Sequence, residues 1–185
     1  ERQQTGRGRC IDISLLDVQV SLQAHLGQFY LVSGEVPQPI GSSHPTNFPI
    51  GAFKARDGKY IHIHCATQKF YENLANVLAT SVSGLEGLPG DPRFATPAGR
   101  LEHRAELGEV LRLAFATRDE AEWTRLLQAA DVPAAPVNTL DRVYQDPRLL
   151  QRGMVVEAEH PVSGRYRMAG NPIKLGQDEV FQPAP

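Results

Sequence analysis

The sequence predicts a mixed α/β protein with an α+β portion in its middle, and three patterns carry that prediction. Apolar residues recur at helical spacing in several segments, two alternating segments flank an Asp57-Gly58 turn, and a Pro- and Gly-rich stretch, 34–48, interrupts the chain. The 185 residues suffice for a substantial core, and 41% hydrophobic with 22% charged residues is typical of a globular domain.

The N-terminal part is predicted to be the end of a helix, a short strand and then a long helix. Gly6 is a plausible helix C-cap, and Cys10 to Ile13 alternate as in a strand. The long helix ends at Gly34. Apolar residues at three- and four-residue spacing form a stripe along it, which predicts burial of much of the helix surface: Leu15, Val18, Leu22, Leu26 and Phe29. Because the chain lacks an initial Met and opens on a helix end, we expect it to be truncated.

The middle of the chain is predicted to be a hairpin followed by helices. Gly51 to Ala55 and Lys59 to Cys65 form the hairpin, with its isoleucines on one face and its histidines on the other. Helices are expected from Gln68 to Leu78, after a capping Asp91-Pro92, and from Thr96-Pro97 through Ala114.

The last third is predicted to contain one more capped helix, a strand, two short helices and an antiparallel pair. Thr117 and Glu120 form a capping box for the first of these helices, which carries Trp123. The other expected elements are a strand from Ala134 to Val137, a helix from Leu140 to Tyr144 capped by Asn138, a helix from Asp146-Pro147 to Arg152, and paired strands Met154 to Glu159 and Arg165 to Met168.

Composition excludes several classes of partner. The net charge of −2 provides no broad basic surface for nucleic acid. No apolar run approaches the ~20 residues of a membrane helix. The two cysteines and the polar first residues favour a reduced, cytoplasmic setting.

Spacing alone identifies no convincing catalytic or metal site. His62 and His64 share a strand face, but Cys65 points to the opposite face and no fourth zinc ligand has a recognisable spacing. Ser42, Ser43 and His44 are adjacent in a loop and form no nucleophile elbow, so a polar turn is the simpler interpretation. The aspartates have positions typical of caps and turns.

Motifs along nearly the whole chain, taken in order, resemble one enzyme family. They are Thr5-Gly6-Arg7-Gly8 with Ile11 to Asp17, Gly41 to Pro45 with Pro49 to Phe53, Asp91-Pro92-Arg93-Phe94 with Arg100 and Arg104, and Pro136-Val137-Asn138 with Asp146-Pro147 and Arg152-Gly153-Met154. The ordered set resembles the class III CoA-transferases, the family of formyl-CoA transferase and the carnitine CoA-transferases.

The resemblance implies part of a two-domain fold. Residues 1–33 would end the first part of a Rossmann-like large domain, 34–48 would be a linker and loop, 49–137 a small α/β domain, and 138–185 the return to the large domain. The family forms interlocked homodimers, so such a dimer is expected of the full-length protein.

The resemblance also implies transfer of CoA from an acyl-CoA to a carboxylic acid through an enzyme aspartyl intermediate, with CoA as substrate and no cofactor. No residue of this chain matches the aspartate, which the resemblance places upstream, so the chain alone is expected to be inactive. The expected substrate-binding loop is the segment that corresponds to the family's glycine-rich lid: Gly41, Ser42, Ser43, His44 and Pro45.

Two alternatives remain. A 2-methylacyl-CoA racemase of the same family would carry a Glu three residues before Phe70, where this chain has Thr67, so the sequence favours a transferase. A non-catalytic CoA-binding or interaction domain is the alternative outside enzymes.

Overall fold

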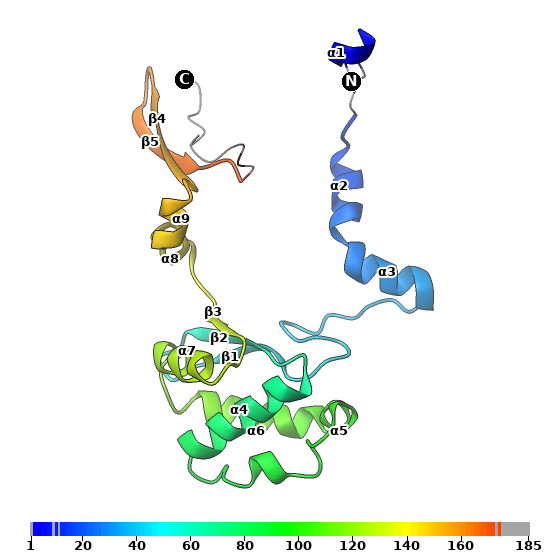
Figure 1. Ribbon diagram of the computed structural model, residues 1–185, viewed down its shortest axis with the longest axis vertical. Helices are drawn as coiled ribbons and strands as arrows, with labels where there is room; N and C mark the ends of the chain where they lie inside the picture. The colour runs from blue at the N-terminus through cyan, green and yellow to red at the C-terminus, as the bar shows by residue number, and fades with distance from the viewer. Residues whose placement is uncertain (1, 9, 11, 173, 175–185) are drawn as a thin grey trace. The chain divides into compact units, whose positions relative to one another are not determined.

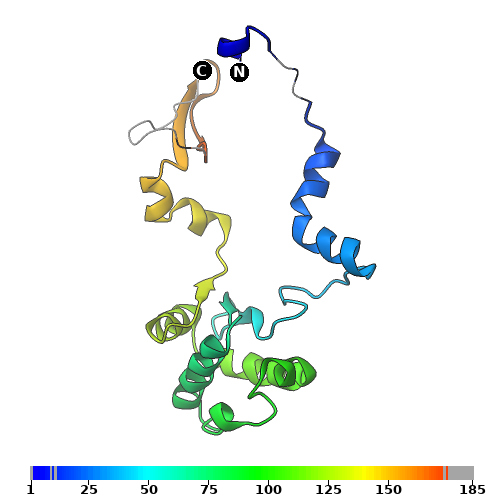
Figure 2. The same ribbon diagram turned by 45° about the vertical axis from the view of Figure 1, so that its right-hand side comes forward.

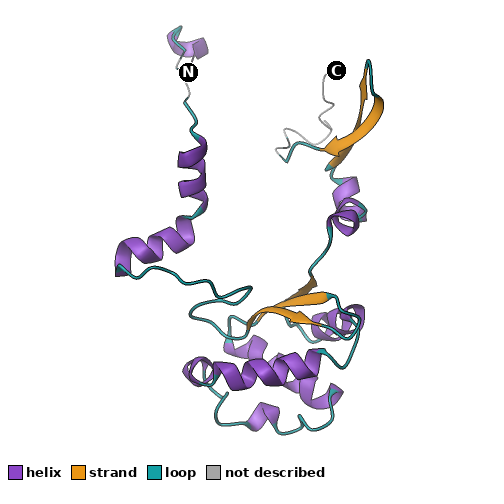
Figure 3. Cartoon of the chain, turned by 180° about the vertical axis from the view of Figure 1, so that it is seen from behind, coloured by secondary structure: helices purple, strands orange, loops and turns teal. Residues whose placement is uncertain are grey.

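A computed structural model describes residues 2–8, 10, 12–172 and 174. The expected mixed α/β class is confirmed, with the helices and strands that Figure 3 distinguishes by colour. The chain divides into two compact units, Glu1–Gly41 and Ser42–Pro185. Among the described residues, no helix has both the length and the apolar character needed to cross a membrane.

The first unit contains three helices: α1 (Arg2–Thr5), α2 (Leu15–Leu22) and α3 (Ala24–Ser33). Gly6 and Gly34 follow helix ends with φ of 67° and 75°, which confirms both predicted stops. The predicted long helix is interrupted at Gln23, whose N–H bonds Val20 O three residues back, and α3 turns away from α2 (Figure 2).

Two other predictions for this unit are wrong. Cys10, Asp12 and Ile13 are irregular, because no described strand pairs with them; Ile11 lies outside the described residues. The predicted burial of the helical stripe also fails, since α2 and α3 bury no residue. Helices that follow one another end to end cannot cover each other's apolar faces, and Leu15 is 84% exposed.

The second unit is built on a three-stranded antiparallel sheet in the order β1-β2-β3. The strands are β1 (Ile50–Lys54), β2 (Tyr60–His64) and β3 (Ala134–Pro136), and the first two form the predicted hairpin. Helices α4 (Gln68–Ser81), α6 (Arg104–Phe115) and α7 (Glu120–Ala129) gather beside the sheet (Figure 1).

The hydrophobic core of this unit is one cluster between Phe48 and Val132. Ile61 and Ile63 of β2 are fully buried in it, which confirms the predicted apolar face. The helices contribute the other large side chains: Leu74, Leu78, Leu107, Leu111, Phe115, Trp123 and Leu127. The sheet and these helices therefore share a single core.

Several helix starts differ from the prediction. Asp91-Pro92 begins a turn rather than a helix after the 3₁₀ helix η1 (Leu88–Gly90), and both oxygens of Asp91 accept hydrogen bonds from Arg93. Thr96 caps α5 (Pro97–Glu102) as expected, but the helix breaks at His103 before α6.

The predicted capping box is also wrong. The N-cap of α7 is Asp119, two residues after Thr117, whose hydroxyl donates to Ala114 O. The next helix, α8 (Leu140–Tyr144), has the predicted bounds, but its N-cap is Thr139, directly before the helix, rather than Asn138.

The C-terminal elements follow the prediction closely. Asp146 accepts a hydrogen bond from Arg148 N and caps α9 (Pro147–Gln151), and Gly153 follows with φ of 60°. Strands β4 (Val155–His160) and β5 (Gly164–Ala169) pair antiparallel.

Candidate functional site

The predicted substrate loop leads into the first strand of the sheet. We call residues 42–49 the entry loop. Strand β1 is an edge strand, paired only with β2. On its open side, Ala52 N–H donates to Ser42 Oγ at 2.9 Å. The entry loop therefore folds back on β1 and satisfies a backbone donor that an edge strand would otherwise present to solvent.

Arg104, at the start of α6, holds the middle of the entry loop. Its Nη2 donates to Ser43 Oγ and to His44 O, both at 2.6 Å. Its guanidinium carbon also lies 5.1 Å from the centroid of the Phe48 ring. One side chain thus contacts both the tip of the entry loop and the residue that anchors its end.

Arg100, one helical turn earlier, holds the end of the entry loop. Its Nε donates to Phe48 O at 3.1 Å, and its Nη1 donates to Phe94 O and Gln68 Oε1. The residue is only 2% exposed, and its burial lowers the pKa of the guanidinium. Since all its hydrogen-bond partners here are neutral oxygens, Arg100 acts as a structural cation within the core.

His44 is oriented by the backbone that follows it. Its Nδ1 accepts from Thr46 N at 3.3 Å and from Asn47 N at 3.2 Å. An imidazole whose Nδ1 accepts two hydrogen bonds carries its proton on Nε2, so these amides select one tautomer. Ser43 and His44 are half-buried, whereas Ser42 and Pro45 are exposed.

The structure brings four of the five predicted loop residues into one anchored segment. Gly41, with φ of 65°, closes the first unit, and Ser42 opens the second. The hydroxyl oxygens of Ser42 and Ser43 accept hydrogen bonds from Ala52 N and from Arg104, respectively. Their part in binding a substrate stays a prediction.

Sequence reasoning missed the two arginines as partners of this loop. The sequence places Arg100 and Arg104 only within a motif, and in the structure they lie on α5 and α6, on either side of the break at His103. A buried position for Arg100 was the least expected feature, because arginine is rarely fully buried.

His62 and His64 on β2, and Cys65 directly after it, have the properties of side chains on a half-buried strand rather than of a metal or catalytic site. Burial lowers the pKa of His62, with a further contribution from His64. Cys65 is 2% exposed, and burial raises the pKa of its thiol to about 12, so it stays protonated and is a poor nucleophile. Within the described part of the chain, no three His, Cys, Asp or Glu side chains are grouped so as to hold a metal ion.

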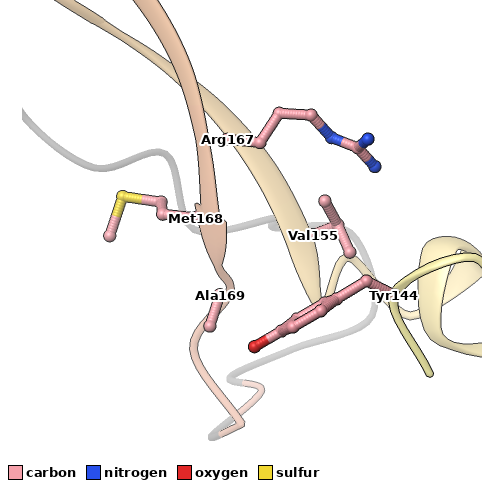
Figure 4. A pocket seen from close by; sticks show the side chains of 5 residues that line it. All are labelled: Tyr144, Val155, Arg167, Met168 and Ala169. Carbon is pink, nitrogen blue, oxygen red and sulfur yellow. The ribbon is translucent and has the colours of Figure 1, made fainter. Parts of the chain in front are cut away.

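A separate hollow of about 330 Å³ lies beside the C-terminal hairpin. Figure 4 shows the ring of Tyr144 below Val155, with Arg167 on the same side of the strands and the side chain of Met168 directed to the other side. The hollow contains none of the predicted loop residues.

Comparisons with known proteins identify relatives of the whole chain. A model of CoA-transferase family III matches residues 1–185. The human succinyl-CoA:glutarate CoA-transferase is 27% identical over 185 residues, which cover 100% of this chain and 41% of the relative. A succinyl-CoA:mesaconate CoA-transferase of Haloarcula marismortui is 31% identical, and the match covers 94% of this chain and 42% of the relative.

A solved structure shares the arrangement. The crystal structure of a CAIB/BAIF family protein from Brucella suis matches with a TM-score of 0.78 at 29% identity, covering 97% of this chain and 45% of that chain. The chain therefore spans less than half the length of these relatives.

Proposed function

The chain belongs to CoA-transferase family III, and on that premise we propose that the full-length protein moves CoA from an acyl-CoA thioester to a carboxylic acid. The single observation that carries this proposal is the family match over residues 1–185. Because the chain spans 41% of the human relative, the activity of the full-length protein is part of the proposal.

The proposed chemistry uses an aspartate outside these residues. Its carboxylate attacks the thioester carbonyl carbon, CoA thiolate leaves, and an acyl-aspartyl anhydride forms. The thiolate then attacks the aspartyl carbonyl, which releases the donor acid and leaves an aspartyl-CoA thioester. The acceptor carboxylate displaces the thiolate from this thioester, and the thiolate then attacks the acceptor carbonyl of the new anhydride, which gives the acceptor CoA ester and restores the aspartate. No step changes an oxidation state, and we propose CoA as the substrate and no cofactor.

The predicted substrate loop, Gly41 to Pro45, is proposed to face the acyl group during these steps. Either its backbone N–H groups or His44 would contact the acyl oxygen, where negative charge develops in each addition step. In the full-length protein, Gly41→Pro and His44→Ala should alter the transfer kinetics. Unchanged kinetics in both variants would contradict the proposal that this loop contacts the acyl group.

The names of the relatives suggest the class of acceptor. Succinate, glutarate and mesaconate are all dicarboxylic acids. We therefore propose a dicarboxylic acid as the acceptor or the donor acid of this protein. By its family, we also propose that the full-length protein acts as an interlocked homodimer.

The test is chromatography of CoA esters after incubation of the full-length protein with succinyl-CoA and a single acid. Glutarate or mesaconate should give a new CoA ester as succinyl-CoA disappears, and acetate should give less. Only hydrolysis, or no product from a panel of donors and acids, would contradict the proposal. The 185 residues alone should transfer nothing.

Two further measurements separate the alternatives. A racemase would exchange the C2 hydrogen of a 2-methylacyl-CoA in D₂O without an acceptor acid. Thr67 disfavours this outcome, because it stands where the racemases carry a Glu; here it is the N-cap of α4, and its Oγ1 accepts from Phe70 N. Tight CoA binding without any turnover would instead indicate a non-catalytic binding domain.

A further inference from the structure

The entry loop is fixed to the helical part of its unit by a single polar side chain at its tip. Arg104 Nη2 has two hydrogens, and its two acceptors, Ser43 Oγ and His44 O, lie at 2.6 Å each. Hydrogen bonds from a charged donor are stronger than neutral ones. Both sites of Nη2 are thus committed to neighbouring residues of the loop.

The contact requires an arginine rather than any cation. The planar guanidinium lies 5.1 Å from the Phe48 ring centroid while its Nη2 reaches Ser43 and His44. Both hydrogen bonds come from one nitrogen, but a lysine ammonium has no planar face to lie near the Phe48 ring while its nitrogen reaches the two acceptors, so it would not reproduce the whole contact. Arg104 therefore links Ser43 and His44, at the tip of the entry loop, to Phe48 near its end. The carbonyl oxygen of Phe48 in turn accepts a hydrogen bond from Arg100.

The helix that carries Arg104 is itself firmly placed. Leu107 and Leu111, on the core side of α6, are fully buried. The core therefore sets the position of Arg104, and the hydrogen bonds from Arg104 set the positions of Ser43 and His44. The ring of His44 is then fixed by the amides of Thr46 and Asn47.

We infer that Arg104 is a positioning residue for the transfer reaction. It contacts no reacting atom; it sets the conformation in which Ser43 and His44 meet the acyl group. This inference rests on the proposed function, because it assigns a purpose to the loop only if the loop lies at the reacting thioester. Small misplacements of such groups reduce rates by as much as about 100-fold.

The test compares four single variants, and the double variant of Arg104→Gln and Ser43→Ala, of the full-length protein with the wild type. Arg104→Gln removes the charge and the guanidinium, Arg104→Lys keeps the charge alone, and Ser43→Ala removes one acceptor on a half-buried loop. Arg112→Gln is the matched control, because Arg112 lies on the same helix and pairs only with exposed Glu109. Ser43→Ala also keeps the test valid if Arg104→Gln fails to fold.

The first readout is amide hydrogen exchange of the peptide containing residues 43–47. Exchange should become about tenfold faster in Arg104→Gln, less so in Ser43→Ala, and stay at the wild-type rate in Arg112→Gln. Exchange in Arg104→Gln equal to that of the control would overturn the inference.

The second readout is kinetic. The kcat of transfer should fall by about 10- to 100-fold in Arg104→Gln, with Arg104→Lys close to it and KM for acyl-CoA changed less. In the double variant, Ser43→Ala should add little to Arg104→Gln, since both remove the same bond. Faster exchange with an unchanged kcat would overturn the positioning role. A wild-type protein without transfer would overturn the proposed function instead, and exchange would still decide whether Arg104 sets the loop.

Discussion

The guanidinium carbon of Arg100 lies 4.1 Å from the ring centroid of Tyr71, so a buried cation rests on a buried aromatic ring. Arg100 is 2% exposed and Tyr71 is 3% exposed. The other contacts of Arg100 are to oxygens of Phe48, Phe94 and Gln68. Cation–π attraction and three hydrogen bonds together replace the water that Arg100 loses on burial.

Arg100→Lys should destabilise the chain by about 2–4 kcal/mol, because a single ammonium cannot serve three diverging acceptors and stack on a ring. Urea denaturation at neutral pH measures the change. Arg112→Lys, an exposed position on α6, should stay within about 0.5 kcal/mol of wild type. Equal stability of the two variants would show that the Arg100 contacts contribute little.

Tyr71→Phe should leave stability unchanged or raise it by up to about 1 kcal/mol. The Tyr71 hydroxyl is buried and has no hydrogen-bond partner in the described chain, and burial raises its pKa to about 12. Removing an unsatisfied buried polar group while keeping the ring should therefore cost nothing. Tyr71→Leu, which also removes the ring below Arg100, should destabilise. A clear loss in Tyr71→Phe would indicate a bound water as the missing partner.

Much of this fold follows from local patterns in the sequence. The Asp57-Gly58 turn with its flanking strands, the cap at Thr96 and the cap at Asp146 depend on neighbouring residues, and all were predicted correctly. Local pattern fails at Thr117 and Asp91: the N-cap of α7 is Asp119, and Asp91-Pro92 lies in a turn. Asp91 bonds Arg93 as Asp146 bonds Arg148, so the local contact alone does not decide whether a helix follows.

The candidate site was harder to predict, because its contacts join residues distant in sequence. Arg104 and Ser43 are 61 positions apart, and no periodicity relates them. The loop itself could be recognised by its resemblance to a family. Its anchoring by two arginines depends on how α5 and α6 lie against the entry loop, which only the tertiary structure shows.

Asp57→Asn should lower stability at neutral pH but not at low pH. The pKa of Asp57 is lowered chiefly by the hydrogen bond from the Lys59 side chain, and backbone N–H groups of Glu120 and Lys59 add to this. A carboxylate with a lowered folded-state pKa stabilises above its unfolded value of about 3.9 and loses this contribution as pH falls through the folded value.

Urea denaturation between about pH 2 and 7 tests this expectation. The stability difference between wild type and Asp57→Asn should shrink on acidification and vanish at the lowest pH, since asparagine keeps the turn and one acceptor. A difference independent of pH would contradict a role for the Asp57 charge.

Residues 42–146 should fold without the rest of the chain, because every residue of the core cluster lies between Phe48 and Val132. The fragment ends after α8 to retain Arg142, whose Nη2 lies 3.3 Å from Oε2 of the buried Glu120. Without Arg142, the Glu120 carboxylate, which is 3% exposed, would lose its cationic partner. The resulting loss of stability could prevent folding for a reason unrelated to the core.

Trp123, the only tryptophan in the sequence, reports on this fold. Its ring is fully buried and its Nε1 donates to Phe115 O at 2.9 Å. Fluorescence of the 42–146 fragment in urea should therefore show one cooperative transition with a midpoint close to that of the 185-residue chain. Leu107→Ala in the fragment should lower the free energy of unfolding by about 2–5 kcal/mol, as expected for a cavity in a packed core. Emission typical of solvent-exposed tryptophan without urea would instead mean that this core needs the segments outside residues 42–146 to form.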